Sequence, residues 1–255
     1  MEKTIFGPPG TGKTTTLLNI VDESLRNGMN PSRIGFVSFS RKAAGEALDR
    51  AKEKFGYDEK ELIWFRTLHS MAFRYLGLKQ QDVIRGSDYN DLGQMIGLEF
   101  RAHAALRMED GPLFVTGVGG DAYLNIISKA RAAEISSERE FNMSAHWSMS
   151  RQQLRIVENA LAQYKSVHSK VDFVDMIEQF IKNGEGPSLD LLIVDEAQDL
   201  TPLQWRMIRE VLVPKSNVVY YAGDDDQCIY SWMGVEVGDF MNSSENVQVL
   251  DKSYR

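Results

Sequence analysis

The chain has 255 residues, of which 43% are hydrophobic and 25% charged, a composition typical of a soluble protein with one large or two modest domains. No apolar run approaches the length of a membrane span, and the N-terminus lacks a signal-like core, so we expect a soluble intracellular protein. One cysteine, Cys228, excludes an internal disulfide framework and a multi-cysteine zinc site, and the net charge of −7 argues against broad electrostatic adhesion to nucleic acid.

The first motif is a glycine-rich loop that reads G-x-x-x-x-G-K-T. The apolar run 4–6 precedes it, and residues 15–26 behind it have helical apolar spacing. A strand, a glycine loop and a helix N-terminus in this order point backbone N–H groups at a polyphosphate. Lys13 would reach the β- and γ-phosphates, and the Thr14 hydroxyl would hold Mg²⁺. The alternative, a glycine-rich turn without a ligand, is disfavoured by the complete spacing. The candidate nucleotide-binding residues are Gly7, Pro8, Pro9, Gly10, Thr11, Gly12, Lys13, Thr14 and Thr15.

Strands and helices then alternate as far as about residue 76. Residues 33–39 read as a buried strand, and Ser40 is a plausible N-cap for a helix over 41–54. A third apolar run, 62–65, leads into a helix that ends near Tyr75. This alternation predicts a parallel sheet covered by helices, as in α/β nucleotide-binding folds.

The pattern changes to a mainly helical block between Leu78 and Asn183. Two apolar helical faces are expected to form core, one of them ending at Val167. They comprise Leu154, Val157, Leu161, Tyr164 and Val167, and Phe173, Ile177 and Phe180. We interpret residues 77–182 as a helical subdomain inserted in an α/β domain made of residues 1–76 and 183–255.

The run 189–194 is almost continuously apolar, as in a central strand of a parallel sheet, and a helix over 202–212 and strands over 218–222 and 247–250 follow. Asp195 and Glu196 come directly after that first run. A phosphate loop needs an acid at the end of a neighbouring strand for the metal and a base for the attacking water. Asp195 is therefore the candidate Mg²⁺ ligand and Glu196 the candidate base; a solvated acidic turn is the alternative.

Seven segments, in the right order, resemble motifs of the UvrD/Rep/PcrA-like superfamily 1 DNA helicases. They are GPPGTGKT, VSFSRKAAGEAL, TLHSMAFRYL, KVDFVDMI, VDEAQDL, AGDDDQCIYSWMG and LDKSYR. The resemblance implies a RecA-like P-loop NTPase fold that uses ATP and Mg²⁺. It also implies a cytoplasmic or nucleoid-associated location.

The resemblance assigns further residues to the nucleotide. Gln227 would sense the γ-phosphate and Arg255 would contact it, so both join Lys13, Asp195 and Glu196 as catalytic candidates. Gln198 would link the nucleotide to the DNA, and Tyr254 would stack on adenine. Thr15 and Met233 stand where the family often has arginine, and Leu68 replaces a usual phenylalanine.

The resemblance also assigns a single-stranded DNA interface. Aromatic side chains can stack on bases of any sequence, which suits a protein without strong positive charge. Thr67 and His69 match positions near the DNA backbone, whereas Phe39 at a strand end is also consistent with a core residue. The candidate DNA-binding residues are Phe39, Thr67, His69, Tyr230 and Trp232.

The interpretation is an ATP-dependent helicase or translocase motor domain that moves 3′ to 5′ along single-stranded DNA or at single-strand/duplex junctions. The resemblance leaves room for a protein loading partner. Because the second RecA-like domain of the family is missing from the sequence, we expect weak ATP turnover from this chain alone. The alternatives are a degenerate DNA-binding ATPase module and a P-loop NTPase with a substrate other than nucleic acid.

Overall fold

The sheet is the centre of the computed structural model, which describes residues 1–8, 10–39, 41–100, 119–144, 149–224 and 237–250. Six parallel strands form it in the order β3-β2-β4-β5-β1-β6. This confirms the α/β prediction. The strands are β1 (Glu2–Phe6), β2 (Ile34–Ser38), β3 (Trp64–Thr67), β4 (Leu189–Asp195), β5 (Ser216–Gly223) and β6 (Val247–Val249).

Strand β4 lies inside the sheet because its side chains are apolar on both faces. It pairs with β2 on one side and β5 on the other, and Leu191 to Val194 are at most 1% exposed. The register places the carboxyl ends of the strands at one edge, with Ser38 opposite Asp195 and Phe6 opposite Gly223. The candidate site residues that follow strands therefore share this edge.

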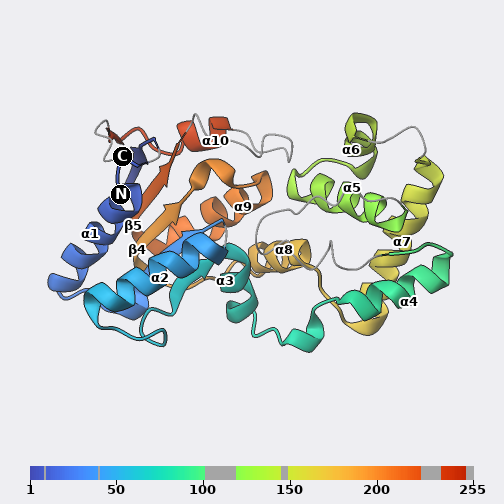
Figure 1. Cartoon of the computed structure of the whole chain (residues 1–255), viewed down its shortest axis with the longest axis horizontal. Helices are drawn as coiled ribbons and strands as arrows, with labels where there is room; N and C mark the ends of the chain where they lie inside the picture. Colours follow the sequence, from blue (N-terminus) through green and yellow to red (C-terminus); the bar gives the residue numbers. More distant parts are fainter. Residues whose placement is uncertain (9, 40, 101–118, 145–148, 225–236, 251–255) are drawn as a thin grey trace.

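Helices cover both faces of the sheet (Figure 1). The helices α1 and α2 pack on one face through Leu17, Val21 and Ala47, and α3, α8 and α9 pack on the other. The helix expected over 202–212 is present as α9 followed by a π-helical turn over Ile208–Leu212. These helices are α1 (Lys13–Arg26), α2 (Arg41–Phe55), α3 (Leu68–Tyr75), α8 (Phe173–Asn183), α9 (Pro202–Met207) and α10 (Val237–Met241).

Four further helices form a block beside the sheet (Figure 1). They are α4 (Gly86–Ile96), α5 (Gly120–Ala132), α6 (Ser137–Ser144) and α7 (Arg151–His168). They enclose a core of their own around Leu92, Ile127 and Leu154. Val167, expected in this core, is 70% exposed, because it lies nearly one turn beyond Tyr164, the last buried residue of α7.

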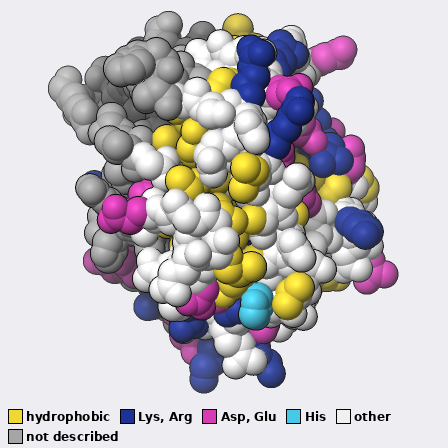
Figure 2. Space-filling model, turned by 90° about the vertical axis from the view of Figure 1, so that its right-hand side faces the viewer, with side chains coloured by type: hydrophobic (Ala, Val, Ile, Leu, Met, Phe, Trp, Pro, Cys, Tyr) yellow, Lys and Arg dark blue, Asp and Glu magenta, His cyan; other side chains and the backbone are white. Residues whose placement is uncertain are grey.

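The outer surface of this block is mixed in character. Figure 2 shows a broken band of hydrophobic side chains among charged ones at this end of the molecule. The exposed large hydrophobic residues of these helices are Met95, Met143, Ile156 and Val167. Among the described residues, no helix is both long and apolar enough to cross a membrane.

Helix α8 joins the helical block to the sheet. Its apolar residues belong to the sheet-side core, although the sequence-based division groups α8 with the insertion. At its N-terminus, Asp172 and Asp175 form ion pairs with two cations. Arg131 of α5 lies 2.9 Å from Asp172 and 2.6 Å from Asp175. Lys165 of α7 lies 2.5 Å from Asp172 and 2.7 Å from Asp175. Burial acts to raise the pKa of Asp172, but Lys165 and Arg131 outweigh it and hold that pKa below its usual value. This ion cluster ties α5 and α7 to α8.

Candidate active site

The phosphate loop connects β1 to α1 with its backbone turned tightly back on itself. Gly10 and Gly12 have φ values of +80° and +81°, in the left-handed region that favours glycine. Gly7 is close-packed, because a Cβ there would lie 2.6 Å from Thr11 Oγ1. Thr11 Oγ1 donates to the Pro8 carbonyl at 2.7 Å, which fixes the loop internally. Pro9 lies outside the described residues.

The N-terminus of α1 faces this loop without a side-chain cap. The helix begins at Lys13, two residues before the expected start, and Gly12 at its N-cap provides no side-chain acceptor. The first backbone N–H groups of a helix have no intrahelical partners, so this end offers donors and a positive dipole to an anion. Lys13 Nζ crosses the loop to the Gly7 carbonyl at 2.6 Å, while Thr14 is half-buried and Thr15 exposed in the first turn.

The acidic pair lies at the end of β4, where Asp195 is 3% exposed. The expectation that this acid ends a strand next to the phosphate loop is wrong, since β5 lies between β1 and β4. Two strand spacings are about 10 Å, so the phosphate loop and Asp195 lie farther apart than two adjacent strands would place them. The positive charge of Lys13 acts on Asp195 and lowers the pKa of that carboxyl, although it is the smaller effect.

Burial and the Glu196 carboxylate nevertheless raise the pKa of Asp195 to about 7. The same two causes raise the pKa of Asp199 to about 7. Asp199 was not singled out from the sequence, although it stands in the D-E-A-Q-D segment. Its Oδ1 is buried and has no hydrogen-bond partner among the described residues. The edge of β4 is therefore a region of unneutralised acid that a cation would stabilise.

Gln198 connects the ends of β4 and β5. Its Nε2 donates to Glu196 Oε2 at 2.9 Å, and its Oε1 accepts from the backbone N–H of Asp224 at 3.2 Å. Glu196 has φ +52°, a left-handed conformation unusual for a residue with a side chain. Gly223 lets Gln198 approach, since a Cβ there would lie 2.3 Å from Gln198 Oε1. Gln198 is thus held between the candidate base and the segment that follows β5.

The donors available for a metal are oxygens. In the described ranges, no three His, Cys, Asp or Glu side chains converge as a metal site. Mg²⁺ commonly takes one or two carboxylates together with substrate phosphates, so the Asp195 carboxylate and the Thr14 hydroxyl suit it. Five other predicted residues, Gln227, Tyr230, Trp232, Tyr254 and Arg255, lie outside the described residues.

The three described DNA-binding candidates differ in their surroundings. Phe39 is 8% exposed and packs in the sheet-side core, which fits a core residue and not one that stacks on a base. Thr67 is 3% exposed and caps α3, its Oγ1 accepting from the Ser70 N–H at 3.2 Å. His69 meets the Phe173 ring edge-on at 5.7 Å, and burial lowers the pKa of His69 to about 4.

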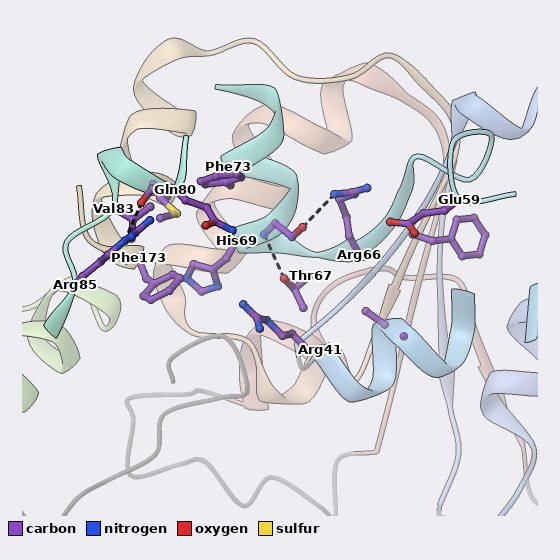
Figure 3. A pocket seen from close by; sticks show the side chains of 15 residues that line it. Arg41, Glu59, Arg66, Thr67, His69, Phe73, Gln80, Val83, Arg85 and Phe173 are labelled. Atoms are coloured by element: carbon purple, nitrogen blue, oxygen red, sulfur yellow. Dashed lines mark hydrogen bonds between the residues drawn. The ribbon is translucent and has the colours of Figure 1, made fainter. Parts of the chain in front are cut away.

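Thr67 and His69 also line a cavity of about 640 Å³ (Figure 3). Its walls come from α2, from β3 and α3, from the segment 80–85 and from α8. Arg66 and Arg85 lie on it and were not predicted from the sequence, because they are far apart in the chain and outside the quoted motifs.

A family model and the curated relatives of this chain agree on one protein family. The UvrD/REP helicase N-terminal domain model matches residues 2–248. The chain is 25% identical to the Probable DNA helicase II homolog of Mycoplasma genitalium over 98% of its own length and 38% of the relative's. It is 23% identical to the ATP-dependent DNA helicase PcrA of Staphylococcus aureus, again over 98% of this chain and 36% of that protein. The chain thus spans little more than a third of these relatives.

Proposed function

The chain belongs to the UvrD/REP helicase N-terminal domain family, and we propose that its phosphate loop binds Mg²⁺-ATP. The observation that carries this proposal is the uncapped N-terminus of α1 with Lys13, which shares one edge of the sheet with the buried acid Asp195. Lys13 and the loop N–H groups would hold the phosphates, and Thr14 and Asp195 would hold Mg²⁺. The metal, when bound, neutralises charge on the phosphates.

Hydrolysis would depend on the residues after β4. Glu196 would accept the proton of the attacking water, and Gln198 would hold the Glu196 carboxylate through their 2.9 Å hydrogen bond. We propose Gln227 and Arg255 as γ-phosphate contacts and Tyr254 as the adenine-stacking residue, as the family resemblance implies.

We further propose that this ATP site drives movement on single-stranded DNA, 3′ to 5′, and at single-strand/duplex junctions. The names of the relatives, DNA helicase II homolog and ATP-dependent DNA helicase PcrA, support a DNA substrate. Tyr230 and Trp232 would stack on bases while Thr67 and His69 lie near the strand. A second RecA-like domain would complete the motor, and a loading partner would act on it in the cytoplasm or nucleoid.

The division into a motor domain (1–76 and 183–255) and a helical insertion (77–182) stays a proposal. The separate core of α4 to α7 supports it. The packing of α8 into the sheet-side core favours a boundary near residue 172.

The test of the ATP site is the binding of a fluorescent ATP analogue in the presence of Mg²⁺. Lys13→Ala should weaken binding at least about tenfold, because it removes a charge-assisted contact to phosphate. Lys52→Ala, which removes an exposed lysine of α2, is the matched control and should bind like the wild type. Equal affinity of Lys13→Ala and the wild type would refute the assignment.

A further inference from the structure

The carboxyl end of β2 holds a buried hydroxyl group without a protein partner. Ser38, the last residue of β2, is 1% exposed. Its Oγ has no hydrogen-bond partner within the part of the chain that the structure describes. Burying a hydroxyl group without a hydrogen bond costs free energy, so nearly all such groups in native proteins are satisfied by protein, water or a bound group. The Ser38 hydroxyl is therefore a candidate for contact with a bound group.

The packing of β2 and β4 fixes the side of the sheet to which this hydroxyl points. Phe36, two residues before Ser38, packs in the core shared with α1 and α2. Ile193, two residues before Asp195, packs in the same core. Side chains alternate between the faces of a strand, so residues two apart lie on one face. Ser38 and Asp195 thus both point to the face that α1 covers.

The parallel register places Ser38 between two polar residues. It lies opposite Asp195 of β4 on one side and opposite Thr67 of β3 on the other. The Thr67 hydroxyl already caps α3, where it accepts from the Ser70 N–H at 3.2 Å (Figure 3). The neighbour whose chemistry can involve Ser38 is therefore Asp195, the acid proposed to hold Mg²⁺.

The spacing of the two strands suits contact through a water molecule. Neighbouring strands lie about 4.8 Å apart, and Ser38 Oγ makes no direct hydrogen bond to Asp195. A water molecule that bridges two polar groups contributes nearly as much as a direct hydrogen bond. Mg²⁺ usually keeps several of its waters when it is bound by one or two carboxylates and substrate phosphates. A metal held by Asp195 would carry such waters beside the end of β2.

We propose that the Ser38 hydroxyl holds a water molecule of the Mg²⁺ that Asp195 binds. The inference rests on the proposed Mg²⁺-ATP site and adds a residue of β2 to it. Ser38 is a positioning residue, because it acts on the metal through the water and contacts neither the metal nor the nucleotide. Groups that orient the ligands of a metal commonly contribute about 10–100-fold to its affinity.

The test is a Mg²⁺ titration of this chain with a fluorescent ATP analogue, starting from chelator-treated buffer. The measured quantity is the Mg²⁺ concentration that gives half of the metal-dependent increase in binding. Ser38→Ala should raise this concentration about tenfold or more and leave the affinity without Mg²⁺ unchanged. Ser38→Thr keeps the hydroxyl and should restore most of the wild-type Mg²⁺ dependence. Ser38→Ala alone decides the question if the added methyl group of Ser38→Thr prevents folding.

Thermal melts without Mg²⁺ separate this role from a structural one. Because the Ser38 hydroxyl has no described protein partner, Ser38→Ala should keep the wild-type Tm or raise it. Ser137→Ala is the matched control, since Ser137 is also buried but donates to Glu158 Oε1 at 2.6 Å. Ser137→Ala should lower Tm and leave the Mg²⁺ dependence of nucleotide binding unchanged.

The outcomes distinguish this inference from the proposed function. If the wild type binds the analogue without any effect of Mg²⁺, the proposed metal site fails and the role of Ser38 fails with it. If Mg²⁺ strengthens binding equally in the wild type and in Ser38→Ala, the role of Ser38 is refuted and the Mg²⁺-ATP site stands. A loss of affinity in Ser38→Ala that is the same with and without Mg²⁺, or a Tm lowered as far as in Ser137→Ala, would also overturn the inference.

Discussion

Gly223→Ala is the sharpest perturbation of the candidate active site, because it adds one methyl group where Gln198 passes. The new Cβ would lie 2.3 Å from Gln198 Oε1 and 2.8 Å from Phe240 Cζ, while ordinary contacts begin near 3.4 Å. Gln198 Oε1 must therefore retreat by about 1 Å, which takes its 3.2 Å hydrogen bond with the Asp224 N–H out of range. The amide that holds Glu196 then loses its position.

The cost has two parts that can be measured separately. Overpacking of this kind destabilises by about 1–3 kcal/mol, which lowers Tm by about 2–12 °C in a chain of this size. A displacement of about 1 Å in a residue that positions a catalytic group can cost about 100-fold in turnover, so kcat should fall while KM for ATP changes little. The assay is steady-state ATP hydrolysis by a C-terminally extended form with poly-dT, together with thermal unfolding.

The matched control is Gly238→Ala, since a Cβ at Gly238 meets nothing within 4 Å. It should keep wild-type turnover and Tm. Gln198→Ala should reproduce the kcat defect of Gly223→Ala without the overpacking. Wild-type kcat in Gly223→Ala, with an unchanged melt, would refute the claim that Gln198 positions Glu196.

Three further predictions concern stability. Arg131→Met should lower the free energy of unfolding by about 3 kcal/mol because it removes one of the two cations, Arg131 and Lys165, that neutralise the largely buried Asp172 and Asp175 carboxylates, whereas Arg155→Met, whose partner pair is exposed, should cost less than about 1 kcal/mol; equal effects in denaturant melts would contradict the role of the ion cluster. Because the pKa of Asp195 is raised from 3.8 to about 7, the folded chain binds the proton more tightly than the unfolded chain. Stability without Mg²⁺ should therefore fall as pH rises through this window, and Asp195→Asn should weaken that dependence in melts; identical pH profiles would rule this out. Thr67→Ala should lower the free energy of unfolding by about 1 kcal/mol through loss of the α3 cap, whereas Thr67→Ser, which keeps the hydroxyl, should retain most of that stability. A Tm equal to wild type for Thr67→Ala would show that the cap is dispensable.

Local features of the fold could be predicted from the sequence because short-range chemistry decides them. The glycine loop, the helix that follows it and the apolar strand before Asp195 each depend on residues close together in the chain. The order of the strands in the sheet does not depend on residues close together in the chain. The placement of β5 between β1 and β4 depends on a pairing between distant segments, and no local pattern distinguishes it from direct contact of β1 with β4.

The sequence motif gives the type of residue at a position, but packing between distant segments decides whether that residue is buried. The motif around Phe39 gives an aromatic at a strand end, but packing against distant helices decides that its ring is covered. The end of the buried face of α7 at Tyr164 could not be predicted for the same reason. Val167 continues the apolar spacing of the sequence, but its side chain is exposed. Arg66 and Arg85 line one cavity only because β3 and the segment 80–85 come together in the fold.

The central claim is that nucleotide hydrolysis in this chain is coupled to single-stranded DNA. The most direct measurement is ATP turnover by this chain and by a C-terminally extended form, each with and without poly-dT. The account predicts slow turnover from the chain alone, strong stimulation of the extended form by poly-dT, and loss of that stimulation in Trp232→Ala. ATP turnover that does not respond to DNA in either form would contradict it and would point to a P-loop NTPase with another substrate.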